Sequence, residues 1–197
     1  MLIDLHCHTL PLSQCSNLQA EELADLARAR GLDGICLTEH DALWDTRDIA
    51  ELGRRTGFLF LHGMELTTDA GHVLAFGFGA GSPAFASVEE AARAAEPAGA
   101  LLYLAHPARD GLLRVTERTR TLFASVETQN GSDSKLQNAS ASGISRSFRL
   151  PGIGGSDAHT PAEVGRTATR FDAHVTDEAS LVAALRSGRY EAVRLDC

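Results

Sequence analysis

The 197-residue sequence has few of the features that mark membrane proteins or disulfide-stabilised proteins. No apolar run approaches the roughly 18 residues that a membrane-spanning helix needs, and no basic segment precedes the first apolar residues. Only four cysteines occur, and none forms a CxxC pair, which argues against a disulfide framework. These absences predict a protein of the reducing cytoplasm that has no membrane partner.

Basic charge is also scarce. Lys and Arg together number 18 against 26 Asp and Glu, so the formal net charge is −8, and this balance argues against nucleic acid as a partner. Hydrophobic residues make up 44% of the chain, which is enough to bury a core, and no repeat, low-complexity tract or linker divides it. We therefore expect a single domain over residues 1–197.

Short apolar runs alternate with segments of helical periodicity along the chain. Strands are expected at 2–5, 34–37, 58–61, 71–77, 101–105, 124–127, 152–155 and 190–193. Helices are expected near 18–30, 44–55, 87–96, 112–120, 133–147 and 178–187. Strands joined by crossover helices pair mostly in parallel, which predicts an α/β fold, either a barrel or an open sheet. Because an eightfold barrel typically takes about 250 residues, a reduced or distorted barrel is the version that this length favours.

Histidine is the residue in which this sequence is rich. Five of its eight histidines stand in polar clusters that follow predicted strands, namely His6, His8, His40, His106 and His159. Glu65, Asn130 and Asp157 also follow predicted strands. The C-terminal ends of parallel strands form one rim, so we expect these side chains to converge there. Imidazole nitrogens and carboxylate oxygens without thiolate favour a catalytic zinc, manganese or iron site.

The spacing within two of these clusters supports a shared site. His6 and His8 are two residues apart, so strand alternation places both imidazoles on one side, and Asp157 with His159 repeats this spacing. The three remaining histidines carry weaker signals. His62, inside a predicted strand, and His174, in an acidic loop, are expected to be structural or surface residues, whereas His72 begins a strand and could line the site.

Six motifs together resemble a known family. DLHCHT at 4–9, TEHD at 38–41, GME at 63–65, AHP at 105–107, ETQN at 127–130 and GSDAHT at 155–160 are similar, in this order, to the motifs of the PHP (polymerase and histidinol phosphatase) domain. The resemblance runs from Asp4 to about Gly165. It implies a distorted (β/α)7 TIM-like barrel with two or three divalent metal ions at the C-terminal strand ends, and hydrolysis of phosphate esters.

The resemblance also implies a ligand set. His6, His8, Glu65 and Asp157 would hold a first metal ion. Glu65 would bridge to a second ion, which His106 and Asn130 would also bind. His40 and His159 would belong to a third site. Two dications that share Glu65 could lower the pKa of a shared water toward roughly 7, and the resulting hydroxide would attack phosphorus.

One departure from the family pattern concerns the third site. Relatives commonly place Ser-Asp-Gly shortly after the first motif, but this chain has no carboxylate between His8 and Glu21. We therefore expect two firmly bound ions of zinc, manganese or iron and a weaker third site, to which the Cys15 thiolate is an alternative ligand. An empty third site would free His40 or His159 to act as a general acid.

The other expected roles concern the surroundings of the metal ions. His40, His159 and Asp157 are the predicted catalytic residues. Asp4, Glu39 and Asp41 adjoin predicted ligands and are expected to orient their imidazoles. The segment 109–149 carries seven basic and four acidic residues, a local charge of +3. One or two of three arginines, Arg109, Arg146 and Arg166, are expected to bind a substrate phosphate.

These observations predict a metal-dependent phosphoesterase that acts on a small phosphorylated metabolite or nucleotide. One alternative is a phosphodiesterase or nuclease that acts on nucleic-acid ends, which the net charge disfavours and the arginine-rich segment permits. The other is a metal-binding subunit without catalytic activity, for which the missing third-site carboxylate is the best support.

Overall fold

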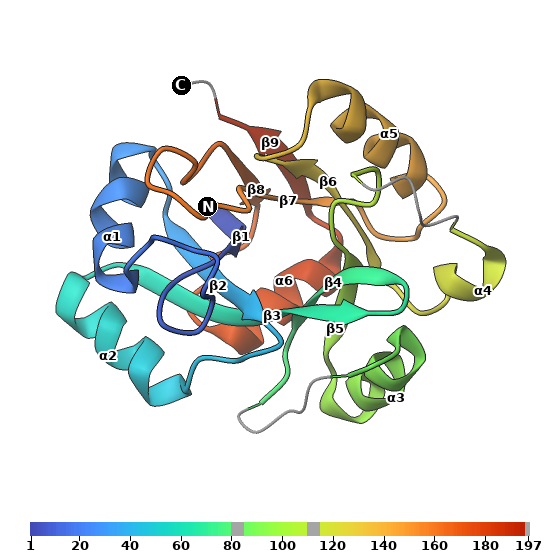
Figure 1. Cartoon of the computed structure of the whole chain (residues 1–197), viewed down its shortest axis with the longest axis horizontal. Helices are drawn as coiled ribbons and strands as arrows, with labels where there is room; N and C mark the ends of the chain where they lie inside the picture. The colour runs from blue at the N-terminus through green and yellow to red at the C-terminus, as the bar shows by residue number, and fades with distance from the viewer. Residues whose placement is uncertain (80–84, 110–114, 196–197) are drawn as a thin grey trace.

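Nine strands form one continuous sheet in the computed structural model, which describes residues 1–79, 85–109 and 115–195. The strands are β1 (Leu2–Cys7), β2 (Gly34–His40), β3 (Leu59–Thr68), β4 (Gly71–Phe76), β5 (Leu101–Leu104), β6 (Ser125–Asn130), β7 (Ile153–Gly155), β8 (Thr167–Phe171) and β9 (Tyr190–Arg194). Their order in the sheet is β7-β6-β5-β4-β3-β2-β1-β8-β9. Figure 1 shows the strands curling into a ring with helices around it.

The ring is nearly closed where β7 returns to β1. Beyond the end of β7, the Asp157 amide donates to the His6 carbonyl at 2.7 Å, and the His8 amide donates to the Ala158 carbonyl at 3.1 Å. This approach requires glycine at position 155, because a Cβ atom there would lie 2.3 Å from the Cβ of His6. The distorted α/β barrel predicted from the sequence is thus confirmed.

The pairing directions differ from the mostly parallel sheet that the sequence predicted. Four of the strand pairs in the described chain are antiparallel: β3 with β4, β4 with β5, β1 with β8, and β8 with β9. β3 extends to Thr68, well beyond the expected 58–61, and a tight turn rather than a helix leads into β4. β8 was not predicted at all. Because β4 runs antiparallel to β3, it begins at the rim where β2 and β3 carry their polar residues.

Helices connect the strands and cover the ring. They are α1 (Ala20–Ala29), α2 (Thr46–Thr56), α3 (Val88–Ala98), the short α4 (Glu117–Arg120), α5 (Lys135–Ser145) and α6 (Glu178–Ser187). Side chains cap several N-termini, as when Ser134 and Gln137 form a capping box at α5. Glycines in the left-handed conformation end α2 and α3, with φ of 66° at both Gly57 and Gly99. Residues 112–114 of the helix predicted near 112–120 lie outside the described residues.

The inside of the barrel is apolar at one end and polar at the other. Ile3, Leu5 and Leu61 pack inside it against Leu181 and Leu185 of α6, which lies within the outline of the ring in Figure 1. These contacts fill the end of the barrel at which the parallel strands begin. The polar C-terminal ends of β1, β2 and β6 lie at the opposite end. Among the described residues, no helix is both long enough and apolar enough to cross a membrane.

Candidate metal centre

Glu65 lies at the centre of the polar rim. Its side chain is 1% exposed, and it comes from β3, opposite His40 of β2 and Leu74 of β4. Five imidazoles surround its two oxygens: His6 at 3.3 Å, His8 at 3.2 Å and His40 at 3.1 Å from Oε2, and His72 and His106 each at 3.0 Å from Oε1. A carboxylate with imidazoles on both oxygens has the geometry of a bridging ligand.

A first group of donors consists of His6, His8, Glu65 and Asp157. The Nε2 atoms of His6 and His8 are 3.1 Å apart and lie 3.2–3.3 Å from Glu65 Oε2. Asp157 Oδ1 lies 3.4 Å from His6 Nε2 and 3.3 Å from His8 Nε2. Four ligands placed tetrahedrally about 2.0–2.1 Å from a zinc ion are about 3.3–3.4 Å from one another. The distances among His6, His8 and Asp157 match this spacing, and Glu65 Oε2 lies at a similar distance from both imidazoles. These four are the residues predicted to hold the first ion.

The charges within this group favour bound protons when no metal ion is present. Burial opposes the charged form of His6, but the carboxylates of Asp157, Glu65 and Glu127 raise the pKa of its imidazole well above the ordinary value. Burial likewise opposes ionisation of Glu65, yet the pKa of this carboxyl lies well below its usual range because His6 and His106 stabilise the anion. A metal ion that binds here must therefore displace protons from imidazole.

A second group consists of His72 and His106, which each lie 3.0 Å from Oε1 of Glu65. The sequence predicted only that His72, which begins a strand, could line the site. The antiparallel direction of β4 places the start of that strand, and His72 with it, at the rim. His72, Glu65 and His40 lie close enough together to share a metal ion.

Asn130, which was predicted as a ligand of the second ion, is held by other protein groups. Its Nδ2 donates to Glu127 at 3.0 Å and to Asp157 at 3.3 Å. Its Oδ1 accepts from Arg109 at 2.8 Å and from the Ser132 amide at 2.8 Å. With both ends of the amide engaged, Asn130 positions its neighbours in this structure.

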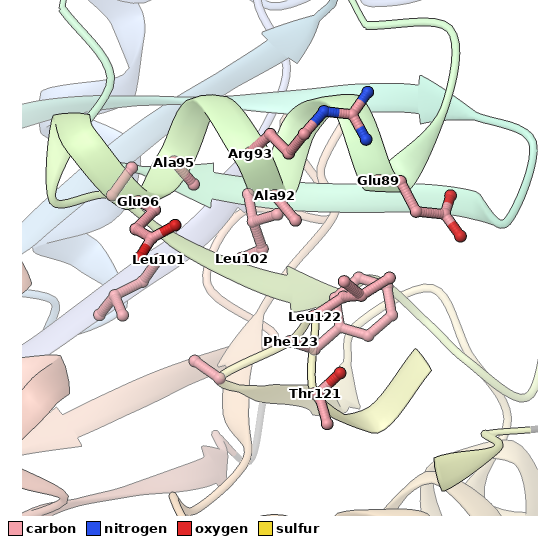
Figure 2. Close-up of a pocket in the computed structure, with 12 residues that line it drawn as sticks. Glu89, Ala92, Arg93, Ala95, Glu96, Leu101, Leu102, Thr121, Leu122 and Phe123 are labelled. Atoms are coloured by element: carbon pink, nitrogen blue, oxygen red, sulfur yellow. The ribbon is translucent and has the colours of Figure 1, made fainter. Parts of the chain in front are cut away.

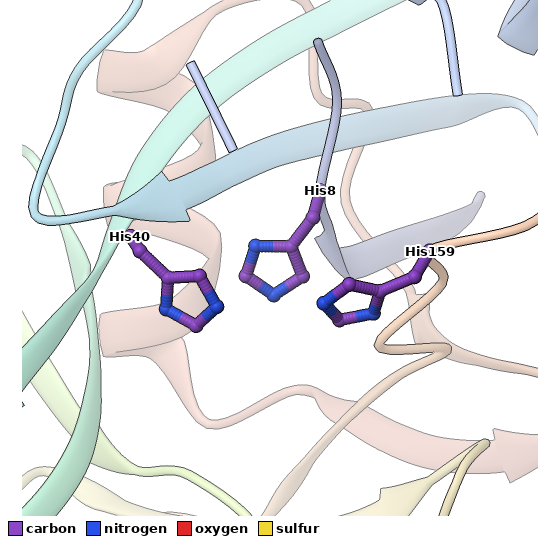
Figure 3. A group of neighbouring side chains, drawn as sticks. All are labelled: His8, His40 and His159. Carbon is purple, nitrogen blue, oxygen red and sulfur yellow. The ribbon is translucent and has the colours of Figure 1, made fainter. Parts of the chain in front are cut away.

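The third group consists of imidazoles. His8, His40 and His159 face one another (Figure 3), and the ring of His8 stacks on His40 at 4.4 Å and on His159 at 4.5 Å. Ser13 occupies the loop where a carboxylate was sought, with its Oγ 3.3 Å from His8 Nδ1. Cys15 is exposed and joins none of the potential ligand groups of the described residues.

The three predicted phosphate-binding arginines occupy different positions. Arg109 lies beside the site, where it contacts Asp133 at 2.7 Å and Asp157 at 2.8 Å. Arg166 directly precedes β8, whose first residues lie at the rim because β8 is antiparallel to β1. Arg146 is the C-cap residue of α5, an 11-residue helix that starts just after β6, so it lies at the far end of that helix from the rim.

The acidic neighbours of the ligands do not orient imidazoles as predicted. Asp4 accepts hydrogen bonds from backbone amides, including that of Ser156 at 2.8 Å. Glu39 accepts from the Thr9 amide and the Trp44 indole, both at 2.8 Å, and Asp41 accepts from the Thr67 amide at 2.8 Å. For Glu39 the prediction was wrong because successive side chains of a strand alternate between faces, so Glu39 points away from the imidazole of His40. Asp4 is two residues from His6, but backbone amides engage its carboxylate instead.

Glu127 is the carboxylate that contacts a ligand imidazole instead, at 3.0 Å from Nδ1 of His6. Sequence reasoning assigned no role to this residue, although it stands in the ETQN motif. His62 is paired with Glu178 at 3.3 Å, and His174 is exposed, as expected for residues outside the site.

A cavity of about 530 Å³ lies elsewhere, between α3 and the segment 121–124 (Figure 2). Mostly apolar side chains such as Leu102 and Phe123 line it, together with Glu89, Arg93 and Glu96. None of the potential ligand groups of the described residues includes a residue of this cavity. The potential ligand groups found among the described residues lie instead at the rim.

Solved structures with the same fold include several bacterial proteins. A two-domain protein from Bacteroides vulgatus, which contains a predicted PHP-like metal-dependent phosphoesterase, has a TM-score of 0.77 at 24% identity over 99% of this chain and 65% of its own. PsfC from Pseudomonas syringae PB-5123 has a TM-score of 0.75 at 19% identity over 98% of this chain and 91% of its own. An amidohydrolase from Chromobacterium violaceum, solved with bound sulfate and no metal, has a TM-score of 0.66 at 18% identity over 98% of both chains.

Comparison with protein families agrees with this likeness in fold. No curated protein matches the sequence. Residues 135–190 match the PHP-associated family, and residues 4–140 match the PHP domain itself. This second match covers well over half of the chain and contains five of the six motifs at the rim. The chain therefore belongs to the PHP domain family.

Proposed function

We propose that this protein is a metal-dependent phosphoesterase that hydrolyses a small phosphorylated metabolite or nucleotide, with residues 1–197 acting as one domain. The observation that carries the proposal is the close spacing of His6, His8 and Asp157, 3.1–3.4 Å between their donor atoms, with Glu65 Oε2 at 3.2–3.3 Å from both imidazoles. The other oxygen of Glu65, Oε1, contacts two further imidazoles, those of His72 and His106. Such a centre suits a reaction in which negative charge develops on phosphoryl oxygens.

The proposed ligands divide into two sets that share Glu65. His6, His8 and Asp157 complete the first, and His72 and His106 complete the second. Zinc, manganese and iron all accept this mixture of imidazole and carboxylate. When bound, the ions would supply Lewis acidity and an activated water at neutral pH. We infer a reducing cytoplasmic location from the free thiols of Cys7, Cys15 and Cys36.

His159 is the residue that we assign to protonate the leaving alkoxide. Its Nδ1 donates to the Asp157 carbonyl at 3.0 Å, so Nε2 is the ring nitrogen that we assign to act on the substrate. The side chain is 29% exposed, so a substrate can reach it. His40 is similarly exposed at 32%, but burial of the remainder lowers the pKa of this imidazole, so that it holds a proton less well at neutral pH.

The arginines are given separate roles. Arg109 is ion-paired with Asp133 and Asp157, so we propose that it orients Asp157 and does not bind the substrate. Arg166, at the start of β8, is then the arginine that we assign to the substrate phosphate.

A phosphate-release screen tests the proposed function. The protein is stripped of metal, reconstituted separately with zinc, manganese or iron, and assayed on phosphomonoesters, nucleotides, oligonucleotides with terminal phosphates, and simple amides. We expect phosphate release from small monoesters and none from Glu65→Gln, with bound metal measured by elemental analysis. Release confined to oligonucleotides would favour the nuclease alternative, and amide hydrolysis would reassign the reaction. Full metal sites without any turnover would indicate a metal-binding subunit.

A further inference from the structure

Glu127 reaches both proposed metal sites without being placed to bind either ion. It lies on β6 and is 1% exposed, and both of its carboxylate oxygens accept hydrogen bonds from residues of the metal centre. We propose that Glu127 couples the two metal sites by fixing one ligand of each, so that losing this carboxylate weakens both sites together. The inference rests on the metal centre of the proposed function.

The first connection is to His6. Glu127 Oε1 lies 3.0 Å from His6 Nδ1, and both side chains are buried. When Nδ1 carries the proton of the neutral imidazole and donates a hydrogen bond to the carboxylate, the lone pair that can bind metal is on Nε2. Nε2 is the atom that lies 3.3 Å from Glu65 Oε2 and 3.4 Å from Asp157 Oδ1. Glu127 therefore selects the tautomer that can bind metal in the first group.

The second connection is to the backbone of His106. The amide of this residue donates to Glu127 Oε2 at 2.9 Å. His106 has a φ of 26°, a conformation that residues other than glycine rarely adopt, so something must hold it there. The same residue presents Nε2 at 3.0 Å from Glu65 Oε1. By holding the His106 amide, Glu127 keeps the imidazole of the second group in place.

A third donor shares Oε2. Asn130 Nδ2 lies 3.0 Å from this oxygen and also donates to Asp157 Oδ2 at 3.3 Å. Glu127 thus accepts three hydrogen bonds, one on Oε1 and two on Oε2. An amide in its place has one accepting oxygen and one donating nitrogen. Glutamine could therefore accept from His6 or from the pair of His106 and Asn130, but not from both. With its oxygen toward the pair, its nitrogen would donate to His6 Nδ1 and move the imidazole proton to Nε2.

The chain offers a matched control in Glu39. This carboxylate is also fully buried and also accepts three hydrogen bonds, from the amide and hydroxyl of Thr9 and from the indole of Trp44. It precedes His40 in sequence, but its hydrogen bonds go to no imidazole. Glu39→Gln and Glu127→Gln thus make the same chemical change, and only the second removes a carboxylate from a ligand.

Metal affinity measured on the whole protein tests the inference. The apo forms of wild type, Glu127→Gln and Glu39→Gln are titrated with zinc in competition with a chelator, after circular dichroism has verified that each is folded. We expect both zinc equivalents to bind ten- to hundredfold more weakly to Glu127→Gln. Glu39→Gln should stay within about threefold of wild type for both equivalents, well below the ten- to hundredfold loss expected for Glu127→Gln.

A measurement on the wild type tests the inference even if Glu127→Gln does not fold. In the zinc-loaded wild type labelled with nitrogen-15 at histidine, His6 should carry its proton on Nδ1 and bind zinc through Nε2. Zinc bound through Nδ1 of His6 would overturn the inference.

The outcomes also separate this inference from the proposed function. A wild type that binds no zinc would overturn both. A wild type that binds two equivalents, together with unchanged affinity in Glu127→Gln, would overturn only the role of Glu127. Weakening of one equivalent alone, or equal weakening in Glu39→Gln, would likewise remove the coupling and leave the metal centre in place.

Discussion

Arg109 and Asp157 form an ion pair directly behind the proposed metal site, with 2.8 Å between a terminal guanidinium nitrogen and Oδ2 of the carboxylate. The other oxygen of Asp157, Oδ1, faces His6 and His8. Asp157 has a φ of 55°, which is uncommon for a residue other than glycine or asparagine. The guanidinium therefore helps to hold a strained residue so that one oxygen remains directed at the metal ligands.

Replacing Arg109 should weaken metal binding more than substrate binding. Arg109→Ala is expected to lower zinc affinity and kcat by about tenfold or more, with KM changed little, because Asp157 loses its orienting partner. Arg109→Lys keeps the charge without the two-pronged geometry and should be intermediate. Chelator competition and steady-state kinetics measure both quantities, with Arg146→Ala as the control. A raised KM with normal metal content would instead assign Arg109 to the substrate.

Metal affinity should rise with pH. His6 has a raised pKa in the metal-free protein, because nearby carboxylates outweigh the effect of burial, so protons compete with metal for its imidazole. Between about pH 6 and about pH 8 the apparent zinc affinity should increase and fewer protons should be released per zinc bound. Calorimetry in buffers of different ionisation enthalpy measures this release. An affinity that is independent of pH would contradict the assigned protonation.

The same shifts predict how stability of the metal-free protein depends on pH. A raised histidine pKa stabilises the folded state below the unfolded pKa of about 6.5, and this contribution is lost as pH rises through the folded value. The lowered pKa of Glu65 acts in the opposite direction, since its contribution is lost as pH falls through the folded value. Melting temperatures of the apo protein should thus fall above about pH 6.5, and again below about pH 4.3. Bound zinc should remove most of the loss on the alkaline side.

Removing His72 should abolish the second metal site and spare the first. His72→Ala takes away an imidazole 3.0 Å from Glu65 Oε1, so bound zinc should fall from about two ions per chain to about one. Asn130→Ala should leave the count near two, since its amide is engaged by protein groups. Elemental analysis after dialysis gives both values. Loss of an ion from Asn130→Ala alone would restore Asn130 as the ligand.

His159→Asn should change the alkaline limb of the pH–rate profile. If His159 gives a proton to the leaving group, kcat should drop by about 10²–10⁴ and its decline at high pH should disappear. Cys15→Ala should keep both the rate and the metal content, because this exposed thiol lies outside the ligand groups. An alkaline limb that persists unchanged in His159→Asn would assign the acid elsewhere.

Gly155→Ala should destabilise the closure of the barrel. The added Cβ would lie 2.3 Å from the His6 Cβ and 2.6 Å from its backbone nitrogen, so β1 and β7 must separate. We expect the free energy of unfolding to fall by about 3 kcal/mol. Gly143→Ala, in α5 with no atom within 4 Å of the new carbon, should instead raise it by about 0.5–1 kcal/mol. Urea titrations of the two variants compare these effects.

Much of the first metal group could be predicted from short-range patterns. The alternation of a strand places His6 and His8 on one side, and the turn after β7 brings Asp157 and His159 to the same end. These relations depend on one or two strands at a time, so spacing along the chain suffices to predict them. The family motifs extend them to Glu65 and His106.

Other contacts depend on pairings between distant strands. His72 reaches Glu65 because β4 runs antiparallel, and Glu127 reaches His6 across 121 residues because β6, β7 and β1 meet when the barrel closes. Asn130 is engaged by Arg109, which follows the neighbouring strand β5. The direction and partner of a strand are set by the packing of the whole sheet, so they cannot be predicted from the periodicity of a short segment. The sequence, poor in cysteine and basic charge and rich in histidine, thus specifies the ligand chemistry, whereas the folded chain selects which side chains share a site.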